Sequence, residues 1–141
     1  MSVKFFLDTN IFIYSFDESQ PAKQARSLAL IAEALHSGLG VISTQVIQEF
    51  LNVALRKFLV PLKPENGKDY LDKVLFPLCQ VFPDVSLYRS ALDIVKDTGY
   101  AFYDSLILAG ATQAGCIILY SEDLSSGHQV GQVKIVNPFI T

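Results

Sequence analysis

Short apolar runs alternate with amphipathic segments along the whole chain, and this alternation limits the possible folds more than any other feature. We expect strands at residues 3–7, 40–43, 80–85, 116–120 and 134–136, with helices at 10–16, 21–37, 44–58, 68–78, 87–98 and 103–114. Strands separated by helices predict a parallel sheet with right-handed crossovers and helices on both faces. The sequence therefore predicts an α/β fold, one domain over residues 1–141, with a central sheet of about five strands.

Proline and glycine set several of the expected boundaries. Pro21 stands at the first position of a helix and Gly38 just beyond its end, which is the usual placement of these two residues. Two prolines between residues 59 and 67 predict a loop. Pro83 would interrupt the hydrogen bonds of a central strand, so the strand at 80–85 is expected at a sheet edge.

Composition narrows the class of protein. Half of the 141 residues are hydrophobic, enough to bury a core, but no apolar run approaches the roughly 18 residues of a membrane-spanning helix. The chain shows no secretory signal, and Cys79 and Cys116 lie too far apart in sequence to form a CxxC pair. We therefore expect two reduced thiols, no membrane association and a cytoplasmic location.

The charge balance bears on nucleic-acid binding. A net charge of −3 and a pI near 5.2 argue against a protein that coats nucleic acid non-specifically, because such proteins present a basic face. An enzyme that touches RNA locally remains compatible with this balance, since bound metal ions would supply positive charge at the phosphate.

Four acidic residues from distant parts of the chain are expected at one rim of the sheet. Asp8 directly follows the first strand and Asp123 follows the strand that ends at Tyr120. Glu49 lies in the helix after the second strand, and Asp104 lies in the first turn of the helix before residue 116. Sites in parallel sheets lie beyond the carboxyl ends of the strands, where these acids are placed.

The chemistry of such a cluster follows from its charge. Carboxylates close together raise each other's pKa, so their convergence is unfavourable unless cations neutralise them. Oxygen ligands without His or Cys select hard ions, here Mg²⁺ or Mn²⁺. One such ion, or two about 3.5–4 Å apart, would activate water for attack on a phosphodiester. Metal-dependent phosphodiester hydrolysis is the reaction that this pattern indicates.

Each acid also has an ordinary structural interpretation when it is taken alone. Asp8 is a preferred residue for capping the helix that starts near Asn10, and Asp104 suits the positive end of its own helix. Glu49 resembles many solvated helix residues, and Asp123 stands in a polar stretch typical of turns.

The residues around the four acids resemble the motifs of the PIN domain family. These motifs are LDTNIF at residues 7–12, ISTQVIQEF at 42–50, FYDSLILA at 102–109 and LYSEDL at 119–124. The ending IVNPF at 135–139 is similar to that of the VapC type, the toxin branch of the family. Each motif is weak by itself, but all four occur in the right order over nearly the whole chain.

This resemblance implies a fold, an activity and partners. It implies an α/β/α sandwich that binds Mg²⁺ or Mn²⁺ and hydrolyses RNA through the matching residues Asp8, Glu49, Asp104 and Asp123. The polar residues beside the acids, which would orient them or bound water, are Thr9, Asn10 and Ser121. VapC-type members are homodimers inhibited by a small antitoxin that inserts a tail into the acidic groove. Glu122 competes with Asp123 as a ligand, but the spacing from Ser121 favours Asp123.

Other polar residues carry weaker signals. His36 stands near a helix end and suits its negative pole, whereas His128 lies in the loop after Asp123, where solvation is the simpler interpretation. Several basic residues are candidates for contact with RNA, although solvated surface charge is the favoured interpretation of each: Lys23, Arg26, Arg56 and Arg89.

Three other functions are compatible with parts of this pattern. A signalling receiver domain has similar architecture but needs an acid after a middle strand, where this chain reads Ile42-Ser43-Thr44. A non-catalytic domain that binds RNA or protein would have no reason to tolerate four mutually repelling acids. A housekeeping RNA-processing nuclease without an antitoxin differs from a toxin only in its biological context, and it remains the main alternative.

Overall fold

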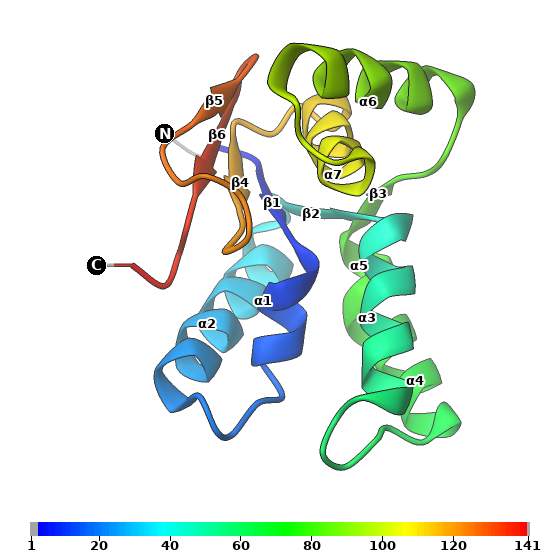
Figure 1. Ribbon diagram of the computed structural model, residues 1–141. Coiled ribbons are helices and arrows are strands. Elements are labelled where there is room, and N and C mark those ends of the chain that lie inside the picture. Colours follow the sequence, from blue (N-terminus) through cyan, green and yellow to red (C-terminus); the bar gives the residue numbers. More distant parts are fainter. Residues whose placement is uncertain (1–2, 141) are drawn as a thin grey trace.

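Six strands form one sheet in the order β3-β2-β1-β4-β6-β5 (Figure 1), as seen in a computed structural model that describes residues 3–140. The strands are β1 (Phe5–Leu7), β2 (Gly40–Ser43), β3 (Cys79–Val81), β4 (Ile118–Tyr120), β5 (Gln129–Val130) and β6 (Val133–Val136). All neighbouring pairs are parallel except β5 and β6. The expected α/β class and parallel arrangement are therefore confirmed, with β3 at an edge.

The expected count of about five strands is low by one. The additional strand, β5, is a two-residue segment that forms an antiparallel hairpin with β6. The hairpin turns at Gly131, whose φ of 59° lies in the left-handed region that glycine adopts without strain. Two residues are too few to show the alternation that identifies a strand in sequence, and so β5 was missed.

The helices follow the expected order with shifted ends. They are α1 (Thr9–Tyr14), α2 (Pro21–Ser37), α3 (Thr44–Arg56), α4 (Pro64–Tyr70), the π-helical turn η1 (Leu71–Leu75), α5 (Phe76–Leu78), α6 (Val85–Thr98) and α7 (Phe102–Gln113). The expected loop at 59–67 is shorter than predicted, because Pro64 serves as the first residue of α4. The segments α4, η1 and α5 follow one another directly and occupy the place of the single helix expected at 68–78.

Helices cover both faces of the sheet, as expected. Helices α6 and α7 lie together on one side, and α1 and α2 lie on the other (Figure 1). The strands between them are fully buried at Phe6, Leu7, Ile42 and Leu119. Gly40 allows α2 to approach closely, since a Cβ atom at this position would lie only 2.1 Å from the Cβ of Ala34.

The residues that directly follow the central strands lie at one edge of the sheet. The backbone N–H of Asp8 donates to the carbonyl of Tyr120 (3.1 Å), and that of Ser121 donates to the carbonyl of Val136 (3.1 Å). These bonds extend the pairing of β1, β4 and β6 past the strand ends, and they fix the backbone positions of Asp8 and Ser121 at this edge.

None of the helices within residues 3–140 is both long and apolar enough to cross a membrane.

Candidate active site

Asp8 lies at the junction of β1 and α1 and is both a helix cap and a buried acid. Its Oδ1 accepts a hydrogen bond from the backbone N–H of Thr9 (2.7 Å), and its Oδ2 accepts one from the hydroxyl of Ser121 (2.7 Å). The residue is only 8% exposed and Ser121 is fully buried. The capping interpretation of Asp8 is thus correct, but it does not compete with a role in the site.

Glu49 faces Asp8 from helix α3 and is held by two donors. The Thr9 hydroxyl donates to Oε1 of Glu49 at 2.5 Å, and the amide nitrogen of Gln45 donates to Oε2 at 3.2 Å. The same Gln45 nitrogen lies 3.1 Å from the carbonyl oxygen of Tyr103, the residue before Asp104. Gln45 therefore links the two helices that carry Glu49 and Asp104.

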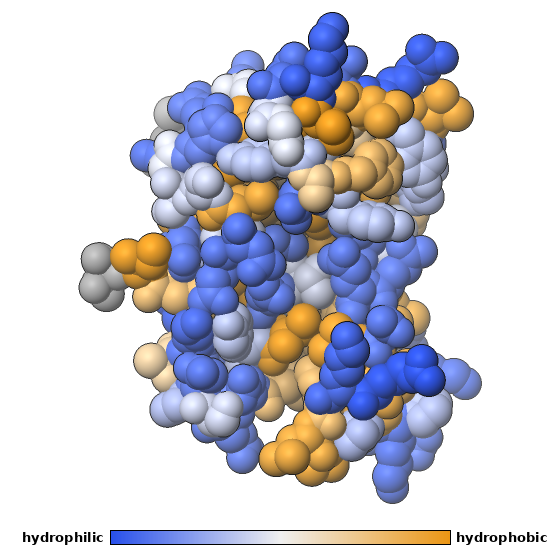
Figure 2. Space-filling view, viewed as in Figure 1, coloured by the Kyte–Doolittle hydropathy of each residue, from blue (hydrophilic) through white to orange (hydrophobic). Residues whose placement is uncertain are grey.

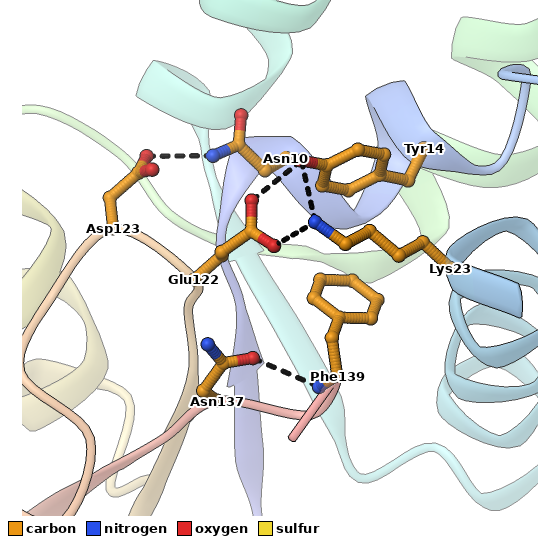
Figure 3. Close-up of polar contacts among 7 residues, drawn as sticks. All are labelled: Asn10, Tyr14, Lys23, Glu122, Asp123, Asn137 and Phe139. Carbon is orange, nitrogen blue, oxygen red and sulfur yellow. Dashed lines mark hydrogen bonds and ion pairs between the residues drawn. The ribbon is translucent and has the colours of Figure 1, made fainter. Parts of the chain in front are cut away.

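Asp104 and Asp123 complete the group of acids. Asp104 lies in the first turn of α7, where the helix dipole favours a negative charge. Asp123 is on the loop after β4, and its Oδ2 accepts a hydrogen bond from the side-chain amide of Asn10 at 2.7 Å (Figure 3). The four acids thus reach the rim from four different segments, as expected.

The pKa values of two of these acids show that the acids interact. Burial raises the pKa of Asp8 to about 6, and the charges of Glu49 and Asp123 add to this, although the bonds from Ser121 and Thr9 oppose it. Burial also raises the pKa of Asp104, with contributions from the charges of Asp123 and Glu49. The charges of Glu49 and Asp123 therefore act on both Asp8 and Asp104, and they disfavour the ionised form of each.

Glu122 and Asp123 have different hydrogen-bond partners. It accepts hydrogen bonds from the Tyr14 hydroxyl (2.6 Å) and the Lys23 ammonium group (2.5 Å), while Asp123 turns toward Asn10 (Figure 3). Burial by itself would raise the pKa of Glu122, but the bonds from Lys23 and Tyr14 outweigh it and hold that pKa below its usual value. The side chain that joins the acidic group is Asp123, in agreement with the sequence spacing.

The side chains of this group suit a hard cation by their chemistry. They offer only oxygen ligands, and the raised pKa values show negative charge that a cation would stabilise. Over residues 3–140, however, no three His, Cys, Asp or Glu side chains already stand in the geometry of a metal site. Asn10, Thr9 and Gln45 instead hold Asp123 and Glu49 by hydrogen bonds, so a cation would compete with these donors for the carboxylate oxygens.

Several of the weaker candidates have structural explanations. His128 accepts or donates a hydrogen bond with the Tyr100 hydroxyl (2.5 Å) and stacks edge-on against that ring. Lys23 is engaged by Glu122, and Arg26 donates from Nε to the carbonyl of Pro138 (3.3 Å). His36 lies in the last turn of α2, as expected. Both cysteines are free, although Cys79 is partly exposed rather than a core residue.

Two residues with a role at the site were not predicted from the sequence. Gln45 lies in the motif at 42–50, and its spacing of four residues from Glu49 is the spacing at which helical side chains meet. Tyr14 was not among the candidate residues, yet its hydroxyl donates a hydrogen bond to Glu122. Nothing in the sequence indicates the second contact, because its partners lie 108 residues apart.

The chain is thus an α/β/α sandwich whose acids gather at the carboxyl edge of its parallel sheet. The sequence profile of the PIN domain matches residues 5–125, and the chain belongs to the PIN domain family. No curated protein sequence matches the chain significantly.

Solved structures of other proteins share this fold. One chain of the FitAB complex bound to a DNA fragment matches with a TM-score of 0.65 and 21% identity, over 97% of this chain and 96% of that one. A chain of DNA-bound VapBC from Salmonella typhimurium gives 0.64 and 18%, over 95% and 97%. VapC20 of Mycobacterium tuberculosis, described as a sarcin–ricin-loop-cleaving toxin, gives 0.59 and 15%, over 85% and 90%.

Proposed function

We propose that this protein is a metal-dependent endoribonuclease in which Asp8, Glu49, Asp104 and Asp123 hold Mg²⁺ or Mn²⁺. The observation that supports this most is the convergence of these acids at one edge of the sheet, where Asp8 and Asp104 have raised pKa values. Figure 2 shows hydrophilic residues gathered across the middle of the face that this edge occupies, between more hydrophobic areas. Acids kept together against their own repulsion indicate a site that works with a cation.

The roles of the residues follow from their contacts. When bound, the cation would lower the pKa of a water molecule and neutralise charge on the phosphate. Asp8 and Glu49 are the most constrained of the four acids, because donors hold both oxygens of each. Thr9 orients Glu49, and Asn10 orients Asp123. Water attacks phosphorus, the bond to the leaving ribose oxygen breaks, and that oxygen takes up a proton.

We further propose that the nuclease is the toxin of a toxin–antitoxin pair, acting in the cytoplasm as a homodimer. The fold is shared with chains of FitAB and VapBC, and with a toxin described as cleaving the sarcin–ricin loop. The ending at residues 135–139 resembles the toxin branch in particular, whereas the motif at 7–12 is typical of PIN domains in general. A housekeeping RNA-processing nuclease with the same chemistry is the second candidate, and the two differ in whether an inhibitory partner exists.

The nuclease proposal is tested by incubating purified protein with total cellular RNA and Mn²⁺. Defined fragments should form, and a chelator or the substitution Asp104→Asn should abolish them while the circular-dichroism spectrum remains that of the folded protein. Intact RNA in all samples would overturn the proposal. The toxin proposal is tested separately by overproduction in cells without a partner, where arrested growth is expected and normal growth would favour the housekeeping alternative.

A further inference from the structure

A hollow opens beside the acids, between the N-terminal ends of α3, α6 and α7. It has a volume of about 430 Å³, within the range of small-molecule sites. Its lining includes Ser43, Gln45, Gln48, Tyr88, Phe102 and Tyr103, and none of its lining residues carries a charge. An uncharged hollow next to an acidic site is suited to a neutral polar group and not to a phosphate.

Three aromatic side chains form the wall of this hollow and remain open to solvent. Tyr88 is 42% exposed, Phe102 is 38% exposed and Tyr103 is 65% exposed. The rings of Phe102 and Tyr103 meet edge to face, with centroids 5.5 Å apart and planes inclined by 68°. Exposed aromatic rings around a cavity are the usual platforms on which unpaired nucleobases stack.

Two polar atoms of lining residues lack a hydrogen-bond partner. These are Oγ of Ser43 and Oε1 of Gln45, both buried. The Gln45 amide nitrogen already contacts Glu49 and Tyr103, so its oxygen is the acceptor left over. A buried acceptor without a donor is unfavourable, and a rotation of the Gln45 side chain that turned Oε1 toward the hollow would let an amino or imino group there donate to it.

Gln45 and Tyr103 also join this hollow to the acidic group. Gln45 lines the hollow and donates to Glu49, while Tyr103 lines it and precedes Asp104 in the chain. A nucleobase stacked on Tyr103 would therefore belong to an RNA strand whose sugar–phosphate backbone passes the acids. We propose that this hollow is a subsite for one unpaired nucleobase of the RNA, next to the phosphate that is cut. The proposal rests on the proposed function and adds a determinant of sequence preference.

Binding of free nucleosides tests the subsite without requiring cleavage. Adenosine, guanosine, cytidine and uridine are each titrated into isotope-labelled, metal-free protein, and NMR shifts are followed at the Gln45 and Gln48 side-chain amides and the Tyr103 backbone. At least one nucleoside should bind with shifts confined to this hollow. Tyr103→Ala should weaken it about fivefold or more, the lower end of the effect of losing one stacking contact. Tyr103→Phe should retain it.

Phe76→Ala provides the matched control, because Phe76 is an aromatic residue 61% exposed on α5 that does not line the hollow. The same variants are then compared on RNA. Tyr103→Ala should raise KM and weaken the base preference beside the cut, whereas Phe76→Ala should change neither. Gln45 and Asp104 stay unchanged in both variants.

The outcomes separate the two proposals. Nucleoside binding that depends on Tyr103, in a protein that cuts no RNA, would support the subsite and overturn the nuclease. RNA cleavage with no nucleoside shifts at these residues and an unaltered base preference in Tyr103→Ala would support the nuclease and overturn the subsite. Burial of the hollow against a second copy in solution, seen as loss of Tyr103 solvent accessibility in a stable dimer, would also overturn it.

Discussion

The hydroxyl of Ser121 donates a hydrogen bond of 2.7 Å to Oδ2 of Asp8, and this contact joins the residues that follow β4 and β1. The bond from Ser121 lowers the pKa of the Asp8 carboxyl, which burial raises. The two residues are 113 positions apart, so the bond exists only because β1 and β4 are parallel neighbours in the sheet. Ser121 thereby keeps Asp8 closer to its ionised form, the form that binds a cation.

Ser121→Ala should shift the pH dependence of RNA cleavage. Without the hydroxyl, the pKa of Asp8 rises further, so activity should appear at a higher pH than in the wild type. Measurement of kcat/KM against pH tests this, with Ser121→Thr as the control that keeps a donor. An unchanged profile in Ser121→Ala would show that Asp8 does not govern the titration of the active enzyme.

Asp8→Asn should make the metal-free protein more stable at neutral pH. The folded pKa of Asp8 is about 6, above its ordinary value of 3.8, so Asp8 contributes stability only below about pH 4 and loses it as the pH rises past 6. The variant does not lose stability in this way, so its free energy of unfolding at pH 7 should exceed that of the wild type by at most about 3 kcal/mol. Urea unfolding at pH 4 and pH 7 with a chelator measures it.

The pH dependence of that gain identifies its cause. The advantage of Asp8→Asn should be much smaller at pH 4 than at pH 7 and approach zero below pH 4, where the wild-type carboxyl becomes protonated in the unfolded state as well as in the folded one. A variant less stable than the wild type at pH 7 would mean that the bonds to Thr9 and Ser121 outweigh the burial of charge. Added Mn²⁺ should stabilise the wild type more than the variant.

Asp123→Asn and Glu122→Gln form a matched pair of adjacent substitutions. Asp123 lies with the acids, whereas Glu122 binds Tyr14 and Lys23 (Figure 3). Asp123→Asn should reduce cleavage at least tenfold with little effect on stability. Glu122→Gln should keep cleavage near the wild-type rate and cost about 0.2–1 kcal/mol, since its ion pair with Lys23 is partly exposed. Equal losses of cleavage in both variants would contradict this division of roles.

Thr9→Val should weaken cation binding without unfolding the protein. Valine keeps the shape of threonine but removes the hydroxyl that donates to Oε1 of Glu49 at 2.5 Å. The carboxylate of Glu49 then loses one of its two orienting bonds, and second-layer contacts of this kind typically contribute 10–100-fold to metal affinity. Calorimetric titration with Mn²⁺ should show this weakening, with Thr9→Ser as the control. Identical affinities in the two variants would argue against an orienting role.

The sequence predicted the fold well where elements were long and bounded by strong signals. Helix α2 runs from Pro21 to Ser37 with Gly38 in a left-handed conformation, as the proline and glycine indicated. Short elements were harder to predict. Strand β5 has two residues, and the start of α4 at Pro64 was hidden in a segment whose prolines predicted a loop. Tertiary pairing decides such segments, and local pattern does not contain it.

The candidate site shows the same division between local and long-range information. The positions of Asp8 and Asp123 after two strands were enough to place them at one edge of the sheet. The separation of Glu122 from Asp123 was predicted only through the spacing from Ser121, and its physical reason, the pairing with Lys23, required the structure. Likewise, the double contact of Gln45 depends on how α3 packs near α7, which a single sequence does not specify.

The chemistry of the cut ends tests the central claim most directly. Total RNA is incubated with wild-type protein and Mn²⁺, and the new ends are mapped and typed, with Asp104→Asn and chelated samples as controls. If the four acids hold a cation that activates water, cleavage should need both the cation and Asp104, and no 2′,3′-cyclic phosphate should form, because water and not the ribose 2′-hydroxyl attacks. Cleavage that persists with chelator or in Asp104→Asn, or that leaves cyclic phosphates, would contradict the account.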